Sequence, residues 1–203
     1  MNVSYVLMSI IAAYLIGSIP TAYIFGRVLK GLDIRQYGSG NVGATNVFRT
    51  VGKVPGIIVL LIDFLKGFTV VTLIPSCLEK LSHGITMDSM YILLGSAVIA
   101  GHIWTIFLRF KGGKGVATTA GVMAGLSPWI LLAGFVVWLV VFLVWRYVSL
   151  ASIAAATSLP IFAVISGRDL YFVLFCAILC LVGVFGHRSN IRRLIYGKEK
   201  KLL

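Results

Sequence analysis

Long apolar runs dominate this sequence and leave little room for a soluble fold. The runs cover residues 5–26, 55–75, 90–108, 116–126, 129–145, 150–165 and 171–186. At about 1.5 Å per helical residue, all but the short run at 116–126 can cross most or all of a hydrocarbon core of ~30 Å. They are also much longer than the ~10-residue alternating strands of a membrane barrel. The sequence therefore predicts an all-α polytopic membrane protein with about seven transmembrane helices, including short or broken ones.

Composition supports this class. Of the 203 residues, 59% are hydrophobic, and the mean hydropathy of +1.01 lies outside the range of soluble globular domains. We expect one integral membrane domain over residues 1–203. The first apolar run lacks the features of a cleaved signal peptide, so it is expected to remain as a span. Cys77, Cys176 and Cys180 are odd in number and predict neither a disulfide framework nor a metal site.

Basic residues predict the orientation in the membrane. The formal net charge of +12 would suggest nucleic acid in a soluble protein, but membrane proteins concentrate Lys and Arg on their cytoplasmic side. We assume that successive runs cross the membrane in alternating directions. The basic residues then fall on one side, including the C-terminal tail, with three exceptions among the 18: Lys66, Lys80 and Arg168. This distribution predicts an outside N-terminus, a cytoplasmic C-terminus, cytoplasmic glycine-rich loops and no nucleic-acid partner.

Three features inside the runs stand out. Pro20 predicts a kink in the first run. Asp63 and Lys66 are three residues apart on one helical face, and each would cost ~2.5–3.5 kcal/mol at the bilayer centre if unpaired. We therefore expect them to pair or to face the protein interior. His102 lies near the end of its run and is expected to be a packing residue.

The first glycine-rich loop reads G-S-G-N-V-G-A-T-N at 38–46. Glycines let successive amides turn toward one point, and a helix starting near Gly43 would direct its positive end there. The pattern G-x-G-x-x-G also matches a dinucleotide fingerprint, but that fingerprint requires a βαβ unit that these flanks exclude. The loop thus predicts an anion site, the alternative being a simple interfacial turn. The candidate ligands are Ser39, Gly40, Asn41, Gly43, Thr45, Asn46 and, one turn further, Arg49.

A second loop, F-K-G-G-K-G-V-A-T at 110–118, repeats the order of two glycines, a small residue and threonine. Each loop follows a span and opens a short helix, so two helix N-termini could meet at one anion site, the alternative being a coincidence in a glycine-rich chain. The loop is not a Walker A motif. Lys114 can supply charge while its glycine neighbours let the backbone approach a ligand. Topology alone would explain Lys111 but not Gly112 and Gly113, and these residues join Lys114 as candidates.

The C-terminal part offers polar residues at membrane boundaries. Ser149 is expected to cap the next helix, although it is also a candidate ligand, and Ser152 one turn later could face a site. His187 and Asn190 share a helical face, with Arg193 beside Asn190. His187 and Asn190 are therefore candidate hydrogen-bond donors to a phosphate. The alternative is an amphipathic helix on anionic lipid.

Carboxylates are scarce outside the spans. The sequence places Asp33 and Glu199 apart from other acidic residues, so no magnesium cluster, and no metal or cofactor, is expected. Phosphoryl transfer from a nucleotide is thereby disfavoured. The substrate is instead expected to arrive already activated.

Five motifs occur in a characteristic order. They are G-S-G-N-V-G-A-T-N, D-x-x-K-G at 63–67, F-K-G-G-K-G-V-A-T, R-Y-V-S-L-A-S at 146–152 and H-R-S-N-I-x-R-L at 187–194. From about residue 10 to 199 the chain closely resembles the PlsY family, the bacterial acyl-phosphate:glycerol-3-phosphate acyltransferases. The resemblance implies transfer of a fatty acyl group from acyl phosphate to the sn-1 hydroxyl of glycerol 3-phosphate. The products would be 1-acyl-glycerol 3-phosphate (lysophosphatidic acid) and inorganic phosphate, in the first step of phospholipid synthesis.

The same resemblance implies the bacterial inner membrane as location and the lipid bilayer as surroundings. It also suggests a partner in the upstream enzyme that makes acyl phosphate. Two competing classes remain at this point. A small anion transporter would use the same loops but expose its substrate to both sides, and a purely structural membrane protein would leave the glycine motifs unexplained.

Roles follow from the motif chemistry. We expect the donor's phosphate at the amides of residues 39–43, with Ser39, Asn41 and Thr45. The acceptor's phosphate is expected at Arg49, Lys111 or Lys114, Ser152, His187 and Asn190. The catalytic candidates are Arg49, Lys114, His187 and Asn190. His187 is also a candidate general base, and the donor's own phosphate is the alternative proton acceptor.

Overall fold

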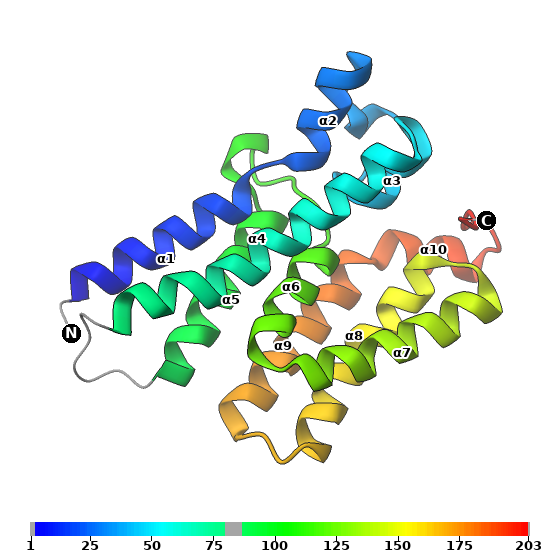
Figure 1. The fold of residues 1–203 in the computed structure, drawn as a ribbon. Coiled ribbons are helices and arrows are strands. Elements are labelled where there is room, and N and C mark those ends of the chain that lie inside the picture. The colour runs from blue at the N-terminus through cyan, green and yellow to red at the C-terminus, as the bar shows by residue number, and fades with distance from the viewer. Residues whose placement is uncertain (1–2, 80–86, 203) are drawn as a thin grey trace. The chain divides into compact units, whose positions relative to one another are not determined.

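The computed structural model describes residues 3–79 and 87–202, and the regular structure in these ranges is helical (Figure 1). The polar loop predicted around Lys80 and His83 lies outside the described residues. Backbone contacts divide the chain into two compact units, Met1–Leu126 and Ser127–Leu203. We describe each unit by itself, and the single-domain assignment stays a prediction.

The first unit contains most of the glycine-rich sequence. Its α-helices are α1 (Val3–Ser18), α2 (Thr21–Lys30), α3 (Ala44–Thr50), α4 (Lys53–Glu79), α5 (Met87–Ile103) and α6 (Val116–Leu126). Two short 3₁₀ helices, η1 (Ile34–Gln36) and η2 (Ile106–Leu108), lie in its connections. The second unit contains α7 (Pro128–Trp145), α8 (Val148–Ile165), α9 (Leu170–Gly186) and α10 (Arg188–Ile195).

The all-α membrane prediction is confirmed. Within the described residues, five segments are long and apolar enough to cross a membrane. A sixth is formed if α9 and α10, which are bent by 57° at their junction, count as one broken span. The short apolar helix α6 completes the seven predicted segments, and it begins and ends at the predicted residues.

Proline shapes two of the spans differently. Pro20 separates α1 from α2, so the predicted kink is a break, visible in Figure 1. Its ring lacks an N–H and clashes with the preceding turn. The second span was predicted to end at Pro75, but α4 continues through that residue to Glu79. Membrane helices tolerate interior prolines because nearby groups satisfy the freed carbonyls.

Glycines let the helices of the first unit approach closely. Helix α1 packs on α5 through Gly17 and Gly101, and α4 packs on α6 through Gly67 and Gly121. A Cβ atom on any of these four residues would collide with a backbone oxygen of the facing helix. Small residues are the usual means by which membrane helices pack, since no hydrophobic effect drives them together in lipid.

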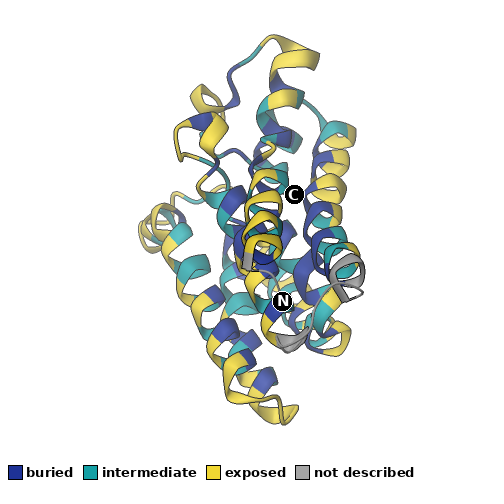
Figure 2. Ribbon diagram, turned by 90° about the vertical axis from the view of Figure 1, so that its left-hand side faces the viewer, coloured by how far each residue is buried: buried dark blue, intermediate teal, exposed yellow. Residues whose placement is uncertain are grey.

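In the second unit, α8 packs against both α7 and α9. Large apolar side chains along α7, including Leu132, Phe135 and Val140, are exposed. Figure 2 shows exposed and buried stretches sharing the same helices, as expected where one face contacts protein and another contacts lipid.

Candidate functional site

The first glycine loop is folded around the side chain of Asn46, which is buried at 1% exposure. Its Nδ2 donates to the carbonyl oxygens of Ile34 and Tyr37, each at 3.0 Å, and its Oδ1 accepts from the amide of Ser39 at 2.9 Å. A Cβ on Gly38, where φ is +62°, would collide with that Oδ1. Asn46 therefore organises the loop, and its predicted contact with substrate stays a prediction.

The loop's amides are arranged differently from the expected cradle. Besides Ser39, the amide of Gly40 donates to Tyr37 at 3.0 Å and that of Gly43 to Asn41 at 3.1 Å. The amide of Asn41 lies 3.4 Å from the hydroxyl of Ser39. The left-handed backbone at Gly38 and Gly40 turns the loop back on itself, so these donors bond within it.

Side chains of the first loop remain accessible. Ser39 is exposed, and Asn41, Thr45 and Arg49 are partly exposed. The predicted short helix is confirmed as α3, with Gly43 as its N-cap. Asn41 and Thr45 lie at the start of α3 and Arg49 in its last turn, so side chains rather than loop amides are the better candidate anion ligands here.

The second glycine loop lies against the end of α5. The amides of Gly112 and Gly113 donate to the carbonyl oxygens of Ile103 and His102, each at 3.0 Å. A Cβ on Gly113 would collide with Nε2 of His102 and would lie 2.6 Å from the carbonyl oxygen of Val42. Val42 belongs to the first loop, so the two glycine motifs are in contact here, whereas the predicted meeting of the two helix N-termini stays a prediction. Lys111 is exposed and Lys114 is partly exposed.

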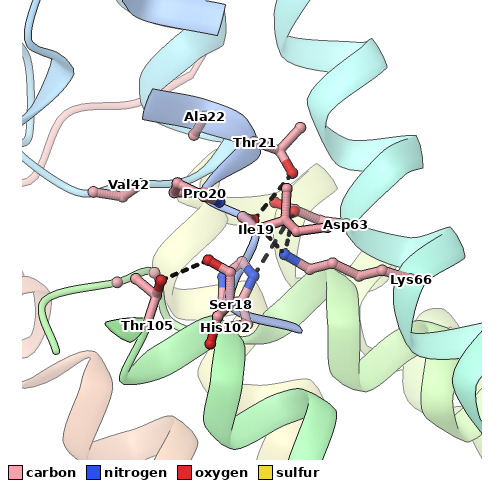
Figure 3. Close-up of a pocket in the computed structure, with 12 residues that line it drawn as sticks. Ser18, Ile19, Pro20, Thr21, Ala22, Val42, Asp63, Lys66, His102 and Thr105 are labelled. Atoms are coloured by element: carbon pink, nitrogen blue, oxygen red, sulfur yellow. Dashed lines mark hydrogen bonds and ion pairs between the residues drawn. The ribbon is translucent and has the colours of Figure 1, made fainter. Parts of the chain in front are cut away.

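Beneath the two loops lies a small polar cavity with about 200 Å³ of empty space, which includes open solvent (Figure 3). Val42, Gly112 and Gly113 form part of its lining, and Asp63 and Lys66 of α4 form another. The Nζ of Lys66 lies 2.8 Å from Oδ1 of Asp63, and both side chains are buried. The predicted intramembrane ion pair is confirmed.

Sequence reasoning missed the place of His102 in this cavity. Its Nδ1 lies 3.1 Å from Oγ1 of Thr118 on α6 and 3.8 Å from Oδ1 of Asp63. A histidine near the end of a span that leads into a glycine loop was the available signal. Nothing local in the sequence connected it to Asp63, because that contact joins two different helices.

In the second unit, polar candidates gather around Glu199, whose side chain is 5% exposed. Its Oε1 accepts from Oγ of Ser149 at 2.7 Å and from Nδ2 of Asn190 at 2.6 Å. Its Oε2 accepts from Nε of Arg193 at 2.6 Å. Burial alone would raise the pKa of Glu199, but these hydrogen bonds outweigh it and hold the pKa below its ordinary value.

The sequence shows Glu199 only as a carboxylate apart from other acidic residues and does not predict these three contacts. The tail folds back, with the amide of Lys198 donating to the carbonyl oxygen of Arg193 and that of Leu202 to Arg146. Ser149 was also expected to cap α8, but the N-cap is Tyr147 and the serine hydroxyl donates to Glu199.

The remaining candidates of this unit have fixed orientations. The hydroxyl of Ser152 donates to the carbonyl oxygen of Val148 at 2.8 Å and accepts from Nε1 of Trp138 at 3.2 Å. His187 is 4% exposed, and its Nδ1 lies 2.8 Å from the carbonyl oxygen of Gly183. Because a carbonyl can only accept, Nδ1 carries a proton.

We expect Glu199→Ala to destabilise the protein by about 1–3 kcal/mol, because it leaves the buried polar groups of Ser149 and Asn190 without this acceptor. The measurement is the thermal midpoint in detergent. Lys198→Ala is the matched control, since its side chain is exposed and its backbone hydrogen bond is retained. An unchanged midpoint in Glu199→Ala would show that the carboxylate does not hold the tail.

A second ion cluster lies outside the spans of the first unit. Oδ2 of Asp33 lies 2.7 Å from Arg35 and 3.4 Å from Arg27. The hydrogen bond from Arg35 outweighs burial and lowers the pKa of Asp33 from 3.8 to about 2. A depressed carboxyl pKa adds stability above the unfolded value, and this stability is lost as the pH falls through the folded value.

We therefore expect the thermal midpoint of the wild type to exceed that of Asp33→Asn at neutral pH. The difference should shrink as the pH falls from 3.8 toward about 2. A difference that stays constant across this window would contradict the assignment of the shift to the arginine contacts.

The comparisons with known proteins agree along the whole chain. A family model described as glycerol-3-phosphate acyltransferase matches residues 7–197. A glycerol-3-phosphate acyltransferase of Desulforamulus reducens is 48% identical over 195 residues, covering 96% of this chain and 94% of that protein. One from Aquifex aeolicus is 44% identical over 196 residues, covering 96% of this chain and 98% of that protein.

Two crystal structures are similar in fold. Both are of PlsY (YgiH), described as an integral membrane glycerol 3-phosphate acyltransferase. Its glycerol 3-phosphate form has a TM-score of 0.87 and 40% identity, covering 97% of this chain and 94% of that chain. Its lysophosphatidic acid form has a TM-score of 0.84 and 39% identity, with the same coverage.

Proposed function

This chain belongs to the glycerol-3-phosphate acyltransferase family, and we propose that it moves a fatty acyl group from acyl phosphate to the sn-1 hydroxyl of glycerol 3-phosphate. The products are 1-acyl-glycerol 3-phosphate (lysophosphatidic acid) and inorganic phosphate, and the reaction is the first step of phospholipid synthesis. The observation that carries the proposal is the contact between the two glycine loops, which approach each other at Val42 and Gly113. Both loops contain or adjoin basic residues.

The chemistry needs little beyond positioning and charge neutralisation. Acyl phosphate is a mixed anhydride, so its leaving group is already a stable phosphate anion. The sn-1 oxygen forms a bond to the acyl carbon, the bond from that carbon to the phosphate oxygen breaks, and the hydroxyl proton passes to a base or to the departing phosphate. Alignment of the two substrates and cationic groups at the developing charge supply the acceleration.

We assign the donor's phosphate to the first loop, with Ser39, Asn41 and Thr45. The acceptor's phosphate is assigned to Arg49 and to Lys111 or Lys114. In the second unit, His187 and Asn190 are proposed to donate hydrogen bonds to the acceptor's phosphate. Both are buried near the junction of α9 and α10. Ser149 and Arg193 are proposed to support Asn190, because all three donate to Glu199. Ser152 is proposed to bind the acceptor's phosphate.

The protein is a multi-pass membrane protein, and we place it in the bacterial cytoplasmic (inner) membrane. The N-terminus is proposed to lie outside and the C-terminus in the cytoplasm, as the distribution of basic residues favours. The acyl chain would lie along apolar helix faces, where each buried CH₂ contributes ~0.8 kcal/mol. The enzyme that makes acyl phosphate is the proposed partner.

One assay tests the function. Purified protein in detergent receives acyl phosphate and glycerol 3-phosphate, and both inorganic phosphate and lysophosphatidic acid are measured. Parallel reactions omit the acceptor or replace the donor by acyl-CoA. We expect products only with acyl phosphate and acceptor together, and activity with acyl-CoA alone would overturn the donor assignment. Uptake of labelled phosphate into proteoliposomes without any acyl transfer would favour a transporter.

His187→Gln tests the identity of the base. Glutamine retains a hydrogen-bond donor but cannot accept a proton at neutral pH. If His187 is the base, kcat should fall by about 10²-fold or more. If most of the rate is retained, His187 is at most a ligand and the departing phosphate takes the proton. The folded state is checked by the thermal midpoint.

A further inference from the structure

We propose that Asp63, Lys66 and His102 form a positioning network that holds the two glycine loops in the geometry required for acyl transfer. None of the three was among the residues assigned to the substrates. The inference rests on the proposed function and adds residues that act through the loops.

Asp63 and Lys66 form a buried ion pair on α4. Asp63 is 2% exposed and Lys66 is 7% exposed, in a helix whose other residues are largely apolar. Removing two charges from water costs several kcal/mol per ion, and replacing a buried pair by apolar residues is often neutral or stabilising. Stability of the fold is therefore a poor explanation for this pair.

The ion pair contacts two other parts of the first unit. Nζ of Lys66 donates to the carbonyl oxygen of Ile19 at 3.3 Å, at the break that Pro20 makes between α1 and α2. Oδ1 of Asp63 lies 3.8 Å from Nδ1 of His102. Figure 3 shows the side chains of Asp63, Lys66 and His102 meeting beside this break. The pair thus connects the α1–α2 break to the end of α5.

His102 in turn contacts the second glycine loop. Its carbonyl oxygen accepts from the amide of Gly113, and its ring occupies the space where a Cβ of Gly113 would lie. The carbonyl of Val42 borders the same space. The position of the ring therefore sets how closely the two loops approach, and Lys114 is the next residue along the chain.

Thr118 holds the same ring from a third helix, α6. Its Oγ1 lies 3.1 Å from Nδ1 of His102 and is fully buried. The hydrogen bond with Thr118 thus orients the ring, and Asp63 lies beside the same nitrogen. A displacement of about 1 Å in a positioned group can cost about 10²-fold in rate. Loss of the network should therefore reduce catalysis more than folding.

The D-x-x-K-G motif now has a structural explanation. Asp63 and Lys66 face the cavity, whereas Gly67 allows α4 to approach the backbone of Thr118 on α6. One turn of α4 therefore lies beside His102 and also packs against α6, the helix that follows the second glycine loop.

The experiment removes the pair without leaving a lone charge. Asp63→Leu/Lys66→Met is compared with the wild type for thermal midpoint, kcat and KM for glycerol 3-phosphate. We expect a midpoint equal to or above that of the wild type. We also expect kcat to be lower by at least about tenfold, with KM changed by less than about threefold. Thr69→Val is the matched control on α4, since it removes a hydroxyl bonded only to its own helix.

A second readout does not depend on activity. Hydrogen exchange at the amides of Gly112 and Gly113 should be faster in the double variant, because the carbonyl acceptors on α5 are held less firmly. If the double variant does not fold, Thr118→Val removes one contact of the ring with nearly the same shape. That variant is expected to lower kcat by at least about threefold.

The outcomes are separable. A wild type without acyl transfer overturns the proposed function. An active wild type, with a double variant that keeps kcat, KM and exchange rates, overturns the positioning network. In the case of the second variant, an unchanged kcat for Thr118→Val does the same.

Discussion

Arg49→Ala and Lys114→Ala are each expected to lower kcat/KM for glycerol 3-phosphate by at least about 10²-fold while the protein remains folded. Both residues belong to the first unit and are partly exposed, Arg49 on α3 and Lys114 in the second glycine loop. Each supplies a fixed positive charge beside a loop proposed to hold phosphate. Charge-assisted contacts of this kind are roughly twice as strong as neutral hydrogen bonds.

Lys53→Ala is the matched control for these two variants. Lys53 is exposed at the start of α4 and has no proposed role in the site. Initial rates over a range of acceptor concentrations, with the thermal midpoint as a check of folding, would decide the matter. Near-normal turnover in Arg49→Ala or Lys114→Ala would remove that residue from the site. An equal loss in Lys53→Ala would point to a general effect of charge.

Gly113→Leu is expected to abolish acyl transfer. Even the first carbon of a side chain at this position would collide with the ring of His102 and press on the carbonyl of Val42. The backbone of Val42 cannot yield without moving the first glycine loop, so the two loops must separate. The loss should exceed about 10²-fold, because both proposed phosphate-binding loops are displaced at once.

Gly43→Ala provides an informative contrast in the same pair of loops. The φ of Gly43 is −158°, which any residue can adopt, and an added Cβ would meet only Nδ2 of Asn41 at 2.8 Å. That amide is the end of a flexible side chain, so we expect a smaller loss of activity than in Gly113→Leu. Gly134→Ala in the second unit is the control, since its Cβ would make ordinary contacts at 3.4 Å and beyond. Equal losses in Gly43→Ala and Gly113→Leu would contradict the loop-separation argument.

Both units show the same use of buried polar groups. In the first, an ion pair and a histidine lie under the glycine loops, and in the second a carboxylate holds the tail against Ser149, Asn190 and Arg193. The chemistry proposed for the protein needs little beyond fixed charges and fixed backbone. Rigid networks of this kind are what such a mechanism requires, because misplaced groups lose most of their effect.

Features with local causes could be predicted from the sequence. The lengths of the apolar runs determined the helices, since a chain in lipid must satisfy its backbone internally. Pro20 determined the break in the first span because its ring and missing N–H act on the adjacent turn. Asp63 and Lys66 were expected to pair because three residues of helix place them on one face.

The sites depended on contacts between distant parts of the chain, which only the tertiary structure decided. Ser149 and Glu199 are 50 residues apart, and His102 reaches Thr118 across 16 residues and two helices. No local pattern specifies which buried donor will find which acceptor, so the sequence did not predict the hydrogen bonds of Glu199 or the contact of His102 with Thr118. The sequence by itself thus determined the helices and the family of the protein. Tertiary packing decided which polar groups meet, because buried hydrogen-bonding groups pair with the partners that the folded chain brings near.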